Sequence, residues 1–204
     1  MIRSNVYVDG FNLYGGALKC SPYKWLDPGK LARRLAPRDA IHRVRYFTAR
    51  VKARSQDPQQ PMRQQTYLRA LATIPHLTIH EGHFRSDVVR MYSPSLRHTI
   101  DVVKTEEKGS DVNLATYVLA DVFRKDCEAV MVISNDADLK EPLRMVKDEL
   151  GVHVTVVNPG PPHKRSLDLP CSAFRQLRQA ALAASQLPPT VTDALGSFQK
   201  PPTW

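Results

Sequence analysis

The residues of this sequence that predict chemistry are four aspartates in three separate segments: Asp9, Asp111, Asp136 and Asp138. The last two lie in the hexapeptide Ser134–Leu139, which directly follows the apolar run 129–133. Such a run is typical of a strand buried on both faces. The helix expected after it needs one capping side chain, which Asn135 or Asp136 can supply. The second carboxylate exceeds that structural need, so the hexapeptide predicts a functional site.

The elements around the other two aspartates predict that all four converge. Asp9 ends a short apolar strand over 6–8, and Gly10 permits a tight turn there. Asp111 opens a long predicted helix that leads into the strand 129–133. Strands that alternate with helices predict an α/β fold with a central, mainly parallel sheet flanked by helices. Right-handed crossovers place the carboxyl ends of its strands along one edge, where ligands bind in such folds.

Four carboxylates at one edge predict a metal site. Like charges raise one another's pKa values, and a hard divalent cation relieves that repulsion. Mg²⁺ or Mn²⁺ prefers oxygen ligands and shares its site with substrate phosphates, as one ion or two. The resulting hypothesis is a phosphodiesterase that acts on nucleic acid. Asn12 is open to two interpretations, a helix cap or a member of this site.

The charge of the chain indicates a polyanionic partner. Its 204 residues carry a formal net charge of +9. Arg50, Lys52 and Arg54 occupy alternate positions where the strand predicted over 41–51 ends. They form either a solvated strand end or a rim that contacts phosphates. The spacing of His76, His80 and His83 fits no zinc motif, so we interpret these histidines as structural.

Composition sets the expected organisation. The length suits one domain, which we expect over 1–184, with a β-hairpin insert at about 86–105. Residues 174–187 predict a last helix, and the Pro-rich segment 185–204 predicts a disordered tail. The three cysteines form no CxxC pair, and neither a signal segment nor a membrane span is apparent. We therefore expect a soluble, cytoplasmic protein.

Three segments of the sequence resemble the NYN domain family, and within it the LabA-like branch of the PIN-like nuclease superfamily. They are Val6–Asn12, Lys108–Ala115 and Ser134–Leu139, which occur in this order. The resemblance implies a PIN-like three-layer fold and endonucleolytic cleavage of RNA with Mg²⁺ or Mn²⁺, and it leaves DNA open as a substrate. It implies that all four aspartates are catalytic metal ligands, and it favours Asp136 over Asp138 as the direct ligand.

The same resemblance extends to other side chains. It implies that Asn12 orients Asp9 or the attacking water, and that Ser134 and Asn135 shape their loop and contact phosphate. Lys108 is a further candidate for contact with the nucleic acid. One alternative is a catalytically silent RNA-binding or regulatory module that retains the fold. An aspartyl-phosphate phosphatase is disfavoured, because Phe11 occupies the position where such enzymes need a second aspartate. The oligomeric state is open, and the insert or the tail is a candidate protein-binding surface.

Overall fold

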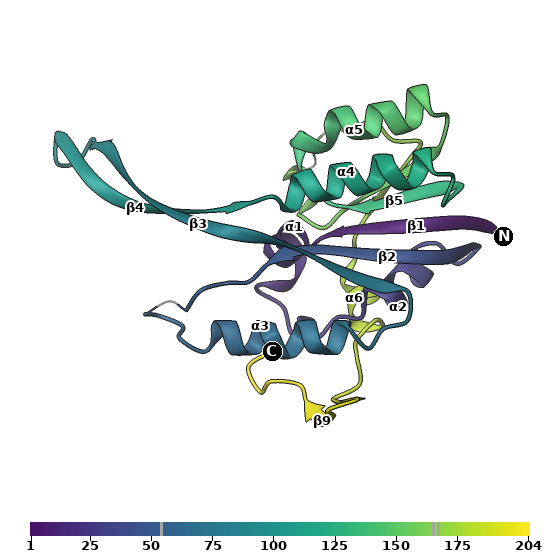
Figure 1. Ribbon diagram of the computed structural model, residues 1–204, viewed down its shortest axis with the longest axis horizontal. Coiled ribbons are helices and arrows are strands. Elements are labelled where there is room, and N and C mark those ends of the chain that lie inside the picture. Colours follow the sequence, from purple (N-terminus) through teal and green to yellow (C-terminus); the bar gives the residue numbers. More distant parts are fainter. Residues whose placement is uncertain (54, 165, 167) are drawn as a thin grey trace.

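The computed structural model describes residues 1–53, 55–164, 166 and 168–204, and a seven-stranded sheet forms its centre (Figure 1). The strands are β1 (Ile2–Asp9), β2 (Asp39–Ala49), β3 (Leu77–Ser93), β4 (His98–Lys108), β5 (Ala129–Ile133), β6 (His153–Asn158) and β7 (Ala173–Gln176). Their order is β4-β3-β2-β1-β5-β6-β7, and all neighbours are parallel except β3 and β4. The predicted α/β fold with a central, mainly parallel sheet is confirmed.

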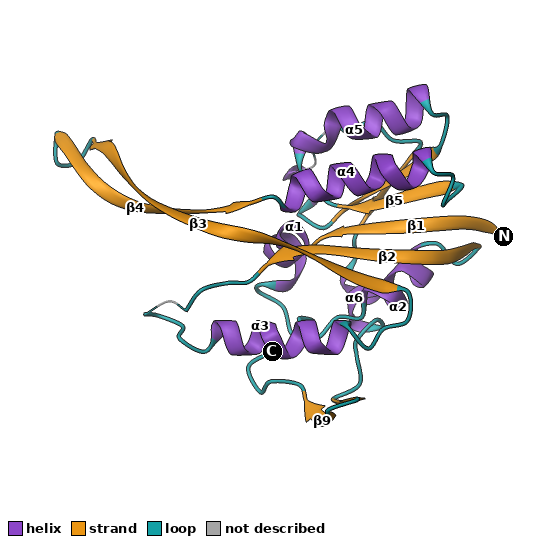
Figure 2. Cartoon of the chain, viewed as in Figure 1, coloured by secondary structure: helices purple, strands orange, loops and turns teal. Residues whose placement is uncertain are grey.

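Helices cover both faces of this sheet (Figure 2). The α-helices are α1 (Gly10–Leu13), α2 (Pro28–Leu35), α3 (Gln60–Leu71), α4 (Ser110–Phe123), α5 (Lys140–Arg144) and α6 (Gln179–Ala183). Helices α4 and α5 lie on one side, and α2, α3 and α6 lie on the other. Among the helices of the described chain, none is long and apolar enough to cross a membrane.

Two apolar cores result from the alternation of side chains along β1. Val6 and Val8 point to one face and pack in the core that α2 and α3 cover, whereas Tyr7 points to the other face, beneath α4. Every residue of β5 is buried, as its apolar composition predicts for a strand covered on both faces. The sheet is therefore the middle layer of the fold and is covered by helices on both faces. The polar groups considered below lie where its strands end.

The order in which the chain adds strands to the sheet reverses between β1 and β5. It first builds β2, β3 and β4 on one side of β1, and then returns to β5 on the other side. In α/β sheets, the carboxyl ends of two such strands flank the crevice in which ligands bind. The ends of β1 and β5 are the positions of Asp9 and of the hexapeptide that contains Asp136.

The prediction of a helix over 174–187 is wrong for its first residues. Residues Ala173–Gln176 form β7, which pairs in parallel with residues 155–158 of β6, and α6 begins only at Gln179. The edge of β6 offers unpaired backbone groups, and pairing with them outweighs the weak local helix preference of this segment.

The C-terminal segment is folded, contrary to the disorder that its composition predicts. It contains a small hairpin of β8 (Thr190–Asp193) and β9 (Gly196–Gln199). Arg69 binds Asp193 through two hydrogen bonds of 2.6 and 2.7 Å. The Trp204 ring lies 6.4 Å from that of Trp25 and 4.9 Å from that of Tyr67. Partners distant in the sequence thus order a segment whose composition alone indicates a tail.

Candidate metal centre

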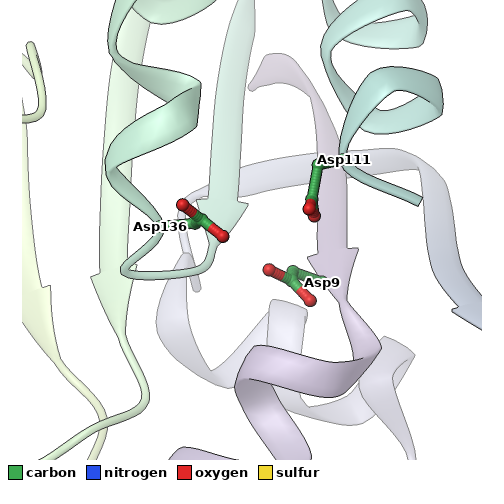
Figure 3. A group of neighbouring side chains, drawn as sticks. All are labelled: Asp9, Asp111 and Asp136. Atoms are coloured by element: carbon green, nitrogen blue, oxygen red, sulfur yellow. The ribbon is translucent and has the colours of Figure 1, made fainter. Parts of the chain in front are cut away.

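Three carboxylates meet at the carboxyl edge of the sheet (Figure 3). Asp9 ends β1, Asp136 follows β5, and Asp111 lies in the first turn of α4. One oxygen of each lies within 4.8 Å of one oxygen of each of the others. Three carboxylate oxygens this close form the donor set that a hard divalent cation prefers. The residues present therefore fit Mg²⁺ or Mn²⁺.

Asp9 is the most buried member of this group and is only 4% exposed. Its Oδ1 accepts a hydrogen bond of 2.9 Å from the Asn12 backbone N–H and so caps α1. Its Oδ2 accepts a hydrogen bond of 2.9 Å from the Ser134 hydroxyl. Burial is the main cause that raises the pKa of Asp9, and these two hydrogen bonds oppose it.

The two asparagines connect the loops around the centre. The Asn12 side-chain oxygen accepts a hydrogen bond of 3.0 Å from the Asn135 backbone N–H and so ties the turn after β1 to the loop after β5. The Asn135 amide donates to the Lys164 carbonyl at 2.5 Å, and its oxygen accepts from the Ser166 N–H at 2.7 Å. In this structure both side chains position backbone, including the segment that holds Asp136.

Asp138 does not join the three close carboxylates. The Asp138 backbone N–H donates a hydrogen bond of 3.0 Å to Asp136 Oδ1, which starts the 3₁₀ turn Ala137–Leu139, and the Asp138 side chain is exposed. Its negative charge still contributes to the raised pKa of Asp111. The hexapeptide thus supplies one close carboxylate, Asp136, and a second one farther out.

Glu107 is a member of the site's surroundings that the sequence did not reveal. Its Oε1 accepts from the backbone N–H of Ser110 at 3.1 Å and from the hydroxyl of Ser110 at 2.8 Å. Glu107 therefore accepts a hydrogen bond from the backbone N–H of the first residue of α4. The only available signal was its spacing, three residues before the first residue of the helix.

Gly82 explains how closely β3 approaches the start of α4. A Cβ atom on this residue would lie 2.3 Å from Glu107 Oε1 and 2.6 Å from the Lys108 carbonyl oxygen. Gly10 is confined in the same way, because a Cβ atom there would lie 2.6 Å from the Phe47 carbonyl oxygen. At each of these positions a backbone carbonyl oxygen lies too close for a Cβ atom, so the neighbouring segments can come this near only at glycine.

The predicted basic rim is only partly available to a ligand. Arg50 binds Glu81 through two hydrogen bonds of 2.8 Å, and Lys108 Nζ lies 3.0 Å from Glu106. Lys52 is exposed, whereas Arg54 lies outside the described residues. Ser134 is fully buried with its hydroxyl on Asp9, a position that supports a carboxylate and leaves no surface for phosphate.

His80 packs as a structural residue, on the face of the sheet beneath α4. Its ring stacks on Phe47 at 5.0 Å and lies 3.2 Å from an Arg45 guanidinium nitrogen. Burial and the Arg45 charge lower the pKa of His80. None of the three histidines belongs to a cluster of candidate metal ligands within the described part of the chain.

The raised pKa of Asp111 predicts that the stability of the metal-free protein depends on pH. Burial, and then the charges of Asp9, Asp136, Glu107 and Asp138, raise its pKa from 3.8 to about 6. Between these values the folded chain binds more protons than the unfolded chain, so this group's contribution to stability falls as the pH rises. In EDTA, we expect Asp111→Asn to gain stability relative to the wild type from about pH 4 to about pH 7. Urea unfolding measures this difference, and a difference that does not change with pH would contradict the assignment.

The fold and the site together define an α/β protein with an acidic, cation-suited centre at the carboxyl edge of its sheet. Residues 3–177 of the sequence match the NYN domain family. This chain belongs to the NYN domain family, and its layered sheet is consistent with a PIN-like fold.

Two similar proteins carry further information. The chain is 27% identical to a protein named 6-hydroxy-3-succinoylpyridine 3-monooxygenase HspA, from Pseudomonas putida (strain DSM 28022 / S16). The alignment spans 237 positions, all of this chain and 75% of that protein. A crystal structure of VPA0982, a protein of unknown function from Vibrio parahaemolyticus RIMD 2210633, superposes with a TM-score of 0.54. It is 16% identical, over 91% of this chain and 96% of that one, so it supports the fold alone.

Proposed function

We propose that this chain is a divalent-metal-dependent ribonuclease of the LabA-like branch, which hydrolyses RNA phosphodiester bonds. The observation that carries the proposal is the close group of Asp9, Asp111 and Asp136 at the carboxyl ends of β1 and β5. A protein that only bound RNA would gain nothing from three carboxylates facing phosphates. Membership of the NYN domain family supports the same reaction class.

Some residues of the chain would hold the metal ion, and others orient the carboxylates that hold it. Asp9, Asp111 and Asp136 would hold Mg²⁺ or Mn²⁺, which supplies Lewis acidity toward a phosphate oxygen when bound. The Asn12 N–H and the Ser134 hydroxyl orient the two oxygens of Asp9 before any ligand arrives. The Asn12 side chain fixes the loop that holds Asp136, so the spacing of the carboxylates is set in advance.

The contacts to the substrate backbone are proposed from charge and position. Lys52 and Lys108 are exposed cations, and Lys108 is three residues before Asp111. Exposed ion pairs are weak, so the pairs of Lys108 with Glu106 and of Arg50 with Glu81 can exchange for phosphates. Asp138 lies outside the close group, and we assign it an accessory role near the substrate.

The proposal is tested by cleavage of labelled RNA. We would incubate the full chain with a single-stranded RNA, a hairpin RNA and a single-stranded DNA of the same sequence, each with Mn²⁺, Mg²⁺ or EDTA. We expect the RNAs to be cut with metal and to stay intact in EDTA. RNA retention without cleavage in any metal would instead favour the silent binding module. Neither retention nor cleavage would reject both nucleic-acid functions.

The relative named a monooxygenase supports a second candidate, because its alignment spans this whole chain. In that case the chain would act on a hydroxylated pyridine. The same preparations would be supplied with 6-hydroxy-3-succinoylpyridine, oxygen and a reduced nicotinamide cofactor. We expect no substrate loss, since the site's close donors are carboxylates suited to a hard cation that binds phosphate. Product formation would favour the second candidate.

A further inference from the structure

Beyond the metal centre, the clearest unexplained feature is the outer part of the β3–β4 hairpin. We define the β-arm as residues 83–108. Strand β3 pairs with β2 only as far as Gly82, and from His83 to Ser93 it pairs with β4. The β-arm projects away from the body of the molecule (Figure 1). An isolated two-stranded ribbon is marginally stable in water at best, and its outer strand edges invite pairing.

The β-arm exposes apolar side chains on both faces. Val88 and Val103 are cross-strand neighbours and are 70% and 72% exposed. On the opposite face, by alternation, Met91 lies beside Ile100, and Met91 is 51% exposed. Large apolar residues that remain this exposed on a contiguous element mark an interaction surface.

Beyond Lys108 at its base, the β-arm carries balanced charges, so it is not the surface that a polyanion would prefer. Its five basic and four acidic residues give a net charge of +1, whereas the whole chain carries +9. Those charges are largely paired within the arm, between Arg85 and Asp87, Arg90 and Asp101, and Lys104 and Glu106. Nucleic acid would be attracted to the basic body of the molecule and not to a balanced, apolar ribbon.

We propose that the β-arm is a homodimerisation element, through which two copies of this chain pack their arms about a two-fold axis. The partner is a second copy because opposite charges, Arg90 and Asp101, flank the exposed valine pair on the same face, and an identical arm in the reverse orientation can match this arrangement. Isologous contacts require this self-complementarity. The projection of the arm also lets two bodies of high positive charge associate while they remain apart.

The test compares the mass of the full chain with that of an arm variant. Val88→Lys combined with Val103→Glu replaces the apolar pair with an opposite-charge pair, which maintains cross-strand pairing. By sedimentation velocity between about 1 and 100 µM, we expect a wild-type dimer and a monomeric variant. We expect the dissociation constant to rise about 100-fold or more, because each copy loses two buried valines from the interface.

Phe123→Gln is the matched control, because Phe123 is 79% exposed at the end of α4, on the body. It should stay dimeric, and circular dichroism should show that both variants are folded. A wild type that remains a monomer throughout, or an arm variant that associates as strongly as the wild type, would overturn the proposal. So would an arm variant that loses RNA retention without any change in mass. None of these outcomes depends on nuclease activity.

Discussion

Replacement of Asp136 by asparagine is expected to reduce metal-dependent RNA cleavage by about 100-fold or more. Loss of groups that merely support metal ligands typically costs 10- to 100-fold, and Asp136 provides one of the three close oxygens. The asparagine oxygen can still accept from the Asp138 N–H, so the turn after β5 should be retained. Cleavage of the single-stranded RNA in Mn²⁺ measures this loss.

The control for this variant removes a carboxylate elsewhere. Asp148 is exposed and pairs with Lys147 on the body, so Asp148→Asn changes the charge identically and should cleave as the wild type does. A second readout is the rise in melting temperature on adding Mn²⁺, which should vanish in Asp136→Asn alone. Full cleavage by Asp136→Asn would reject Asp136 as a metal ligand.

The second large effect is expected at a buried ion pair, away from the metal centre. Asp121 is 2% exposed and accepts a hydrogen bond of 2.9 Å from the Tyr7 hydroxyl. Arg45 donates to its two oxygens at 2.6 and 2.8 Å. Asp121→Ala leaves the largely buried guanidinium unpaired, and breaking such a pair costs about 3–5 kcal/mol of folding free energy. Urea unfolding should show this loss.

A double substitution distinguishes the lost pair from lost packing. In Asp121→Leu with Arg45→Met, both charges are replaced by apolar side chains, and we expect most of the stability to return. The exposed pair of Glu141 and Arg144 provides the comparison, and Glu141→Gln should change stability far less. If Asp121→Ala were no more destabilising than Glu141→Gln, the buried pair would not be a major contributor to stability.

The spacing of apolar residues along the sequence predicts most of the strands and helices of the fold. Five consecutive apolar residues in β5 predict a strand covered on both faces, and this pattern needs no partner to be recognised. Phe174, in contrast, lies in β7 because the edge of β6 accepts a parallel neighbour, and no local pattern encodes that edge. The C-terminal segment was missed for the same reason. Trp204 is one aromatic ring in a polar stretch, and its partners Trp25 and Tyr67 lie far away in the sequence.

The residues that could form an acidic centre are recognisable from local sequence. Strand ends followed by aspartate are local features, and the rule that parallel strands share a carboxyl edge turns them into one site. The packing of the folded chain is what brings Asp9, Asp111 and Asp136 close together and leaves Asp138 outside the group. The same packing places the Ser134 hydroxyl on Asp9 and buries Asp121 against Arg45. Such choices depend on distances between segments about a hundred residues apart, which burial and pairing set only after the chain has folded.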